Sequence, residues 1–175
     1  ASSAESRTEL EFAIKALGDW STGVVPHLPI GSRVWVDGPF GAFTPDRRAV
    51  PGLVLIAGGI GIAPMRSIVH TLADRRDPRP VVLFHAAHDE TRVAFRDEME
   101  ALRSRRSQGT LDLIYVLEEP ATDRPAERGL ISAELLSRRL PAEHRAWHHL
   151  ICGPPPMVDA VEQALRDRKE HTSEL

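Results

Sequence analysis

The strongest apolar pattern in the chain is the run from Leu53 to Ala57, which contains no polar residue. A run this short and this uniformly apolar is typical of a central strand in a parallel sheet, buried on both faces. Three glycines and a proline follow, and apolar residues then recur at the helical spacing i, i+3, i+4, i+7. These apolar positions are Met65, Ile68, Val69 and Leu72. The pattern predicts a strand, a tight turn and a helix.

Strands and helices continue to alternate downstream. Further strands are predicted at 81–87, 111–117 and 147–152, and a helix is predicted after each of them. The helix that follows the strand at 111–117 is predicted at 131–140, with Ser132 as its cap. The apolar faces of these helices are formed by Phe95, Met99 and Leu102, by Leu135 and Leu136, and by Met157, Val161, Ala164 and Leu165. Alternating strands and helices predict an α/β fold with a Rossmann-like parallel sheet and right-handed crossovers.

The first third of the chain has a different pattern. Residues 9–17 alternate apolar and polar positions, which predicts a half-buried strand, and residues 33–36 predict a second short strand. Between them, a turn leads into a short helix with Ser21 or Thr22 as its N-cap. Residues 47–52 then form a linker. We therefore expect one domain at 1–48 and a second at 49–175.

Composition narrows the class of protein. The 175 residues carry a net charge of −3 without a dense basic block, so a nucleic-acid partner is not expected. The single cysteine, Cys152, excludes an intramolecular disulfide and favours a reducing compartment. We expect a cytoplasmic location, or the cytoplasmic face of a membrane if the parent protein has transmembrane helices. No apolar run approaches the roughly 20 residues that a membrane-spanning helix needs, so we expect no membrane contact from this chain. The first residue is Ala1 rather than methionine, which suggests a longer parent protein.

The glycine turn after the first apolar strand suits an anion. Gly58, Gly59 and Gly61 permit backbone angles closed to other residues and let a phosphate approach the amides. Pro64 suits the first turn of the helix, whose free amides point toward the turn. The third glycine of the common dinucleotide pattern G-x-G-x-x-G is missing, so a purely structural glycine turn remains an alternative. The hydroxyl and amides around Ser21 offer a second candidate anion site, with a plain capped turn as the alternative.

The turns after the first and last predicted strands should meet. In a parallel sheet, ligands bind at the carboxyl ends of the strands where the strand order switches. This rule places residues 58–64 and 152–157 on the same rim of one crevice.

Three ordered motifs resemble those of the ferredoxin–NADP reductase superfamily: Gly-Pro-Phe-Gly at 38–41, Gly-Gly-Ile-Gly-Ile-Ala-Pro at 58–64, and Cys-Gly-Pro-Pro-Pro-Met at 152–157. The stretches 17–21 and 95–98 resemble more specifically the C-terminal dehydrogenase region of ferric reductases and NADPH oxidases. The resemblance implies that residues 1–48 are the end of a β-barrel FAD-binding domain and that residues 49–175 bind NAD(P)H. It also implies transfer of a hydride to FAD, and of electrons onward to haem, iron or an iron–sulfur partner.

The resemblance assigns roles to particular residues. Ser21 and Thr22 would hold the FAD pyrophosphate, and the NAD(P)H pyrophosphate would be held by Gly58, Gly59, Gly61 and Pro64. Cys152, Gly153 and Pro154 would lie beside the nicotinamide, with Cys152 affecting hydride transfer. The aromatic and hydroxyl flavin motif of the family is absent, as are several barrel strands. We therefore expect FAD only in the intact parent protein, with an upstream flavin barrel and an electron acceptor as partners.

Several assignments stay open at this stage. Cys152 suits either the core or the nicotinamide site. His88 or Arg92 could meet the 2′-phosphate of NADPH, whereas Asp89 could instead bind the ribose hydroxyls of NADH. His85 and His88 lack a third metal ligand nearby, so we expect no metal site. The alternative to an oxidoreductase is a non-catalytic module that senses NAD(P)H.

Overall fold

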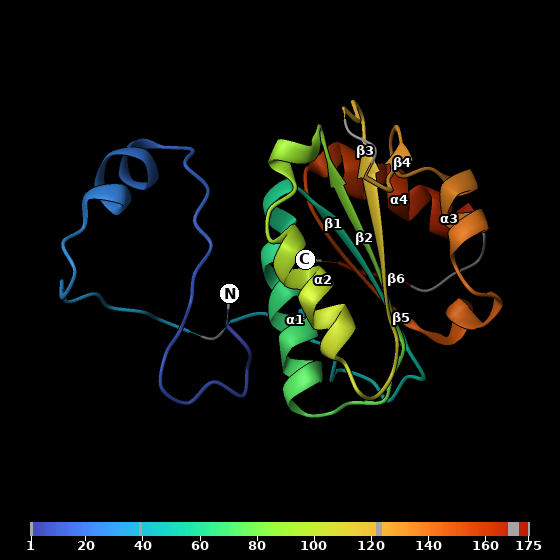
Figure 1. Ribbon diagram of the computed structural model, residues 1–175, viewed down its shortest axis with the longest axis horizontal. Coiled ribbons are helices and arrows are strands. Elements are labelled where there is room, and N and C mark those ends of the chain that lie inside the picture. The colour runs from blue at the N-terminus through green and yellow to red at the C-terminus, as the bar shows by residue number, and fades with distance from the viewer. Residues whose placement is uncertain (1, 39, 122–123, 168–171, 175) are drawn as a thin grey trace.

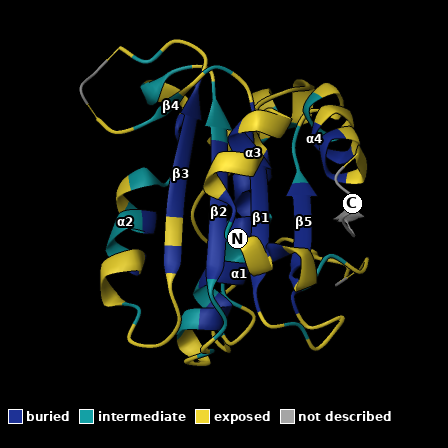
Figure 2. Cartoon of the chain, turned by 90° about the vertical axis from the view of Figure 1, so that its right-hand side faces the viewer, coloured by how far each residue is buried: buried dark blue, intermediate teal, exposed yellow. Residues whose placement is uncertain are grey.

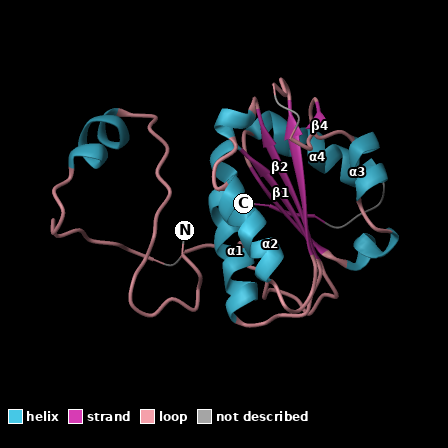
Figure 3. Cartoon of the chain, viewed as in Figure 1, coloured by secondary structure: helices cyan, strands magenta, loops and turns pink. Residues whose placement is uncertain are grey.

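The structure is a computed structural model that describes residues 2–38, 40–121, 124–167 and 172–174. A parallel sheet lies between two layers of helices, with α1 and α2 on one face and α3 and α4 on the other (Figure 1; Figure 3). The strands are β1 Leu53–Gly58, β2 Val81–Ala87, β3 Leu111–Leu117, β4 Glu127–Arg128, β5 His148–Cys152 and β6 Thr172–Glu174. The helices are α1 Ile62–Asp74, α2 Arg96–Arg105, α3 Ala133–Arg139 and α4 Pro155–Asp167.

The strand order confirms the predicted Rossmann-like topology. The order is β4-β3-β2-β1-β5-β6, and every adjacent pair is parallel. The chain builds outward from β1 through β2 and β3, and then crosses to the other side of β1 to form β5. The switch point therefore lies between β1 and β5, where parallel sheets bind their ligands.

Strand β1 is buried on both faces, as its uniform apolar pattern predicted (Figure 2). Leu53 and Leu55 pack into the core under α1 and α2, whereas Val54 and Ile56 pack into the core under α3 and α4. Each fully buried aliphatic side chain contributes about 1.5–3 kcal/mol to folding. The strand consequently fixes the position of the glycine turn that follows it.

The predicted helical faces are also observed. Met65, Ile68, Val69 and Leu72 of α1 are buried. In α3, the hydroxyl of Ser132 accepts a hydrogen bond from the amide of Leu135 at 3.2 Å, which confirms the predicted cap. The strands β4 and β6 were not predicted, because two or three residues are too few to show a period of two.

The prediction of strands in the first third of the chain is wrong for this structure. Leu10, Phe12 and Ile14 are 66%, 60% and 48% exposed, and Trp35 within the second predicted strand is 85% exposed. A strand forms only through hydrogen bonds to a neighbouring strand, and among the described residues of 1–48 neither segment has one. The described part of residues 1–48 therefore shows no strand of a flavin barrel. This segment contains instead the helical turns η1 (Trp20–Val24) and η2 (Val25–His27).

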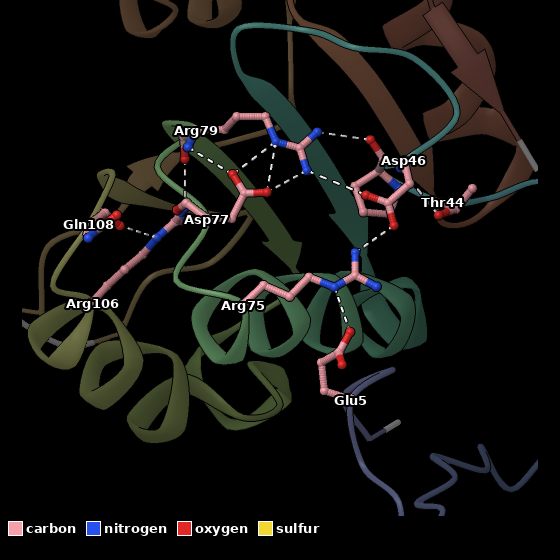
Figure 4. A network of polar contacts seen from close by, with 9 residues as sticks. Glu5, Thr44, Asp46, Arg75, Asp77, Arg79, Arg106 and Gln108 are labelled. Atoms are coloured by element: carbon pink, nitrogen blue, oxygen red, sulfur yellow. Dashed lines mark hydrogen bonds and ion pairs between the residues drawn. The ribbon is translucent and has the colours of Figure 1, made fainter.

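Ion pairs attach this first segment to the sheet domain. At the end of α1, Arg75 donates to Glu5 at 2.6 Å and to Asp46 at 2.7 Å (Figure 4). Close to Arg75, Arg79 donates hydrogen bonds to Asp77, and these bonds lower the pKa of the Asp77 carboxyl group. The network thus joins residues 5 and 46 to the edge of the sheet domain opposite the glycine turn.

Within the part of the chain that the structure describes, none of the helices is both long enough and apolar enough to span a bilayer.

Candidate nucleotide-binding site

The turns after β1 and β5 lie against each other at the carboxyl edge of the sheet, as the sequence predicted. A Cβ atom at Gly61 would lie 2.0 Å from the carbonyl oxygen of Cys152, and one at Gly153 would lie 3.1 Å from the Cα atom of Gly58. A Cβ atom at Gly58 would lie 2.6 Å from the sulfur of Met157 in α4. These three glycines therefore allow two turns and a helix to pack closely.

Gly59 differs from its neighbours. Its φ of +54° is in the left-handed region, and a Cβ atom placed there would meet nothing within 4 Å. Helix α1 begins three residues later, and its N-cap residue, Gly61, makes no side-chain capping bond. Open space beside a bare backbone, at the positive end of a 13-residue helix, suits a phosphate group.

A cavity of about 640 Å³ opens at this edge of the sheet. Its walls come from the ends of β1, β2 and β3, from the start of α4, and from the first segment. The lining residues are Lys15, Gly58, Gly59, Ile60, Ala86, Ala87, His88, Arg92, Ala94, Glu118, Leu130, Ile131, Pro154, Pro156, Met157 and Ala160. A mostly apolar cavity of this volume with a few charged groups is typical of a small-molecule or cofactor site.

The structure brings some of the predicted site residues together and separates others. Five of them line the cavity: Gly58, Gly59, His88, Arg92 and Pro154. Gly61 and Gly153 are not among its lining residues and serve the contact between the two turns. Pro64 is in the first turn of α1, as predicted.

Cys152 packs against the core beneath α1 and is not part of the cavity lining. Burial raises the pKa of its thiol, which therefore stays protonated at neutral pH. The backbone of Cys152 nevertheless contacts the glycine turn through Gly61. Any effect of Cys152 on a nucleotide would thus pass through packing at the rim.

Ser21 and Thr22 lie in η1, outside the cavity lining. The hydroxyl of Ser21 accepts hydrogen bonds from the amides of Leu17 and Gly18, both at 3.0 Å, and donates to the carbonyl of Gly18. The N-cap position belongs to Asp19, so the prediction of Ser21 or Thr22 as the cap is wrong. Ser21 lies inside η1 rather than before it, so its hydroxyl stabilises the turn at residues 17–18 instead of capping the helix.

Charged side chains of both signs follow β2. Asp89 accepts hydrogen bonds from the amide and hydroxyl of Thr91, which lower the pKa of its carboxyl group. Arg92 is 71% exposed, with its Nε atom 3.6 Å from Asp89. His88 lies 3.4 Å from the carboxylate of Glu118. The Arg92 side chain is thus mostly exposed beside the cavity, whereas Asp89 is held by its own turn.

Lys15 is the one cationic lining residue that sequence reasoning missed. It comes from the first segment, more than 40 positions before the glycine turn, and it was the polar member of a predicted strand. Its position in the sequence did not indicate a binding role, since polar residues alternate with apolar ones throughout residues 9–17. Only the folded chain places Lys15 at the cavity.

A metal site does not emerge from the described residues, among which no three His, Cys, Asp or Glu side chains form a metal-binding group. His85 is buried under α2, beside Tyr115, and burial lowers the pKa of its imidazole to about 4. It therefore remains neutral at physiological pH.

Comparison with known proteins adds a family. A family model described as the oxidoreductase NAD-binding domain matches residues 55–163, more than half of the chain. The chain is 33% identical over 146 residues to NADH-cytochrome b5 reductase 1 of Cryptococcus neoformans, covering 79% of this chain and 49% of that protein. It is 29% identical to NADH-cytochrome b5 reductase 2 of Mus musculus, covering 90% and 63% respectively. The chain spans about half the length of the first curated relatives that it matches.

A solved structure of a cytochrome b5 reductase domain has a similar fold. The cytochrome b5 reductase domain of Ulva prolifera nitrate reductase superposes with a TM-score of 0.79 at 25% identity, covering 90% of this chain and 64% of that one. These relatives are cytochrome b5 reductases, so the comparisons support the broad superfamily resemblance and not its finer part, the likeness to ferric reductases and NADPH oxidases. With the parallel sheet and its glycine turn, the match over residues 55–163 shows that this chain belongs to the oxidoreductase NAD-binding domain family.

Proposed function

We propose that this chain is the NAD(P)H-binding portion of a flavin-dependent oxidoreductase. The observation that carries the proposal is the open space beside the backbone of Gly59. This residue lines the cavity of about 640 Å³ and lies just before the start of α1, which has no side-chain cap. A site of this form binds a phosphate and offers an apolar wall for the rest of a dinucleotide.

Each part of the site has a task in this proposal. The backbone at Gly59 and the first amides of α1 hold the pyrophosphate, and Lys15, which also lines the cavity, offsets its charge. Arg92 and His88 lie where the adenosine ribose would be, after β2. Pro154 borders the end of the site that would hold the nicotinamide.

The bound nicotinamide supplies the hydride, so the protein contributes position and charge rather than an acid or a base. The contact between Gly61 and Cys152 fixes the distance between the two turns, and hence the width of the site. The apolar wall formed by Ile131, Met157 and Ala160 excludes water from one side of the cavity.

FAD belongs to the parent protein in this proposal. The hydroxyl of Ser21 is turned into its own loop, so the described residues of this segment do not present a finished flavin site. We propose that residues 1–48 complete a barrel domain together with preceding sequence, and that the domain boundary lies near residue 48. There Ser21, Thr22 and the neighbouring amides would hold the FAD pyrophosphate.

The named relatives favour a haem protein of cytochrome b5 type as the electron acceptor. A ferric reductase or NADPH oxidase is the second candidate, supported by the stretches 17–21 and 95–98. Supplying reduced full-length protein with cytochrome b5 and, separately, with a ferric chelate would distinguish these acceptors.

The direct test is titration of the chain with NADH and with NADPH, in which the fluorescence of the nucleotide reports binding. Binding of either one with a Kd at or below the millimolar range supports the proposal, and binding of neither contradicts it. A non-catalytic NAD(P)H sensor would also bind. The full-length protein separates the two, because only the oxidoreductase would bleach a bound flavin when NAD(P)H is added.

A further inference from the structure

Arg66 of α1 joins three separate parts of the chain. Its Nε atom donates to both carboxylate oxygens of Glu98 in α2, at 2.9 and 3.0 Å, and its Nη1 atom donates to Glu11 at 2.7 Å. The guanidinium also lies 4.9 Å from the ring centre of Phe95. The Arg66 side chain is only 12% exposed, so these partners hold it in one place.

Glu11 is attached to α1 at a second point. Its amide donates to the hydroxyl of Ser2 at 3.3 Å, and the carbonyl of Ser2 accepts a hydrogen bond from Ser67 at 2.6 Å. Ser67 is the next residue after Arg66. We refer to the contacts among Ser2, Glu11, Arg66 and Ser67 as the Glu11 clamp.

The Glu11 clamp lies just before Lys15 in the sequence. Residues 12–15 form neither helix nor strand, and an extended chain covers about 3.3 Å per residue, so Lys15 lies within about 13 Å of Glu11. Phe12 and Ile14 are 60% and 48% exposed, so packing does little to position this stretch. Among the described residues, the clamp is therefore the hydrogen-bonded contact nearest to Lys15 that ties the first segment to the sheet domain.

Arg66 is also close to the glycine turn. It lies four residues after Ile62, the first residue of α1, which is about 6 Å along a helix axis. One helix thus carries, at its start, the amides proposed to bind phosphate and, about one turn later, the arginine that binds Glu11.

We infer that Arg66 is a positioning residue for nucleotide binding, which acts through Glu11 to hold Lys15 at the cavity. The inference rests on the proposed function, since it assigns a purpose to the Lys15 side chain. The two carboxylates that Arg66 binds, Glu11 of the clamp and Glu98 of α2, are charged at neutral pH. Hydrogen bonds from Arg66 lower the pKa of Glu11, and the burial that opposes ionisation of Glu98 is outweighed by hydrogen bonds from Arg66 and His70, so its pKa is lowered too.

The test is a double-mutant cycle on the 175-residue chain, with NADH and NADPH as probes. Glu11→Gln, Arg66→Gln and Lys15→Ala should each raise Kd by about 3–10-fold. Once Lys15 is alanine, adding Glu11→Gln or Arg66→Gln should raise Kd by less than about 1.5-fold further. Arg66→Lys, which keeps the positive charge, should recover part of the affinity. Arg75→Gln is the matched control, because it breaks ion pairs of α1 with Glu5 and Asp46 away from the cavity.

A second readout needs no nucleotide. Trypsin cleavage after Lys15, followed by mass spectrometry, should be faster in Glu11→Gln and Arg66→Gln than in Arg75→Gln. Unchanged Kd in the two clamp variants, or losses that simply add to that of Lys15→Ala, would overturn the inference while leaving the nucleotide site intact. A wild-type chain that binds neither nucleotide would overturn the proposed function itself, and the inference with it.

Discussion

The carbonyl oxygen of Cys152 occupies the space that a side chain at Gly61 would need, at 2.0 Å from an ideal Cβ position. This contact joins the turn after β1 to the turn after β5, although the two lie about 90 positions apart in the chain. The width of the candidate site is therefore set by a backbone contact that tolerates no added atom.

Gly61→Ala should consequently destabilise the fold. An added methyl group against a backbone carbonyl must push the two turns apart, and overpacking of this kind costs about 1–3 kcal/mol or more. Urea unfolding monitored by circular dichroism measures the loss. Gly23→Ala is the control, since a Cβ atom there meets nothing within 4 Å and its φ lies outside the left-handed region. An unchanged midpoint for Gly61→Ala would show that the turns separate at no cost.

Gly59→Val should instead weaken nucleotide binding while the fold survives. The side chain would fill the open space beside the helix start and would be strained at a φ of +54°. We expect Kd for NADPH or NADH to rise by at least about tenfold, or about 1.4 kcal/mol. Gly31→Val, also at positive φ with nothing nearby, controls for strain alone. Equal affinity in Gly59→Val and the wild type would make this turn purely structural.

Arg92→Ala should distinguish the two nucleotides. The guanidinium is 71% exposed on the cavity wall, and an exposed charge pairing with a 2′-phosphate contributes about 1 kcal/mol. Its removal should weaken NADPH binding about 5–10-fold and leave NADH binding within about twofold. Arg103→Ala removes a comparable exposed arginine, paired with Glu100 in α2. Equal losses for both nucleotides would assign Arg92 to general electrostatics.

His85 should make the fold less stable in mild acid. Its pKa falls from 6.5 in the unfolded chain to about 4 in the fold, chiefly through burial and secondarily through Arg96. The unfolded state therefore takes up this proton first. The free energy of unfolding decreases as pH falls from about 6.5 toward 4, by up to about 3 kcal/mol.

Replacing His85 with Phe should flatten that decrease. Chemical unfolding at a series of pH values between 7 and 4 measures the slope. A residual slope is expected from His148, whose pKa is also lowered by burial. If His85→Phe leaves the pH profile unaltered, the imidazole is hydrated or paired in solution.

Cys152→Ala in the flavin-loaded full-length protein should lower the rate of hydride transfer by about tenfold, and change Kd less. The thiol packs behind the rim, so its loss would shift the turn that borders the nicotinamide rather than remove a contact with phosphate. Stopped-flow measurement of flavin reduction at saturating nucleotide is the test. A parental rate would identify Cys152 as a packing residue only.

The sequence by itself determined the α/β domain. The uniform apolar run at 53–57 and the helical spacing after it are local patterns, and both follow directly from burial on two faces or on one. The glycine turn and the cap at Ser132 could be predicted for the same reason, because each depends on a few adjacent residues.

Tertiary structure alone decided the rest. The alternating pattern at 9–17 looks like a strand, yet a strand needs hydrogen bonds to a neighbour, which no local pattern can supply. Contacts between distant residues are equally invisible in sequence. Which of the glycines faces open space, and which faces a carbonyl, depends on how β1 and β5 meet. Lys15 reaches the cavity only because the first segment docks on α1, through ion pairs such as that of Glu11 with Arg66.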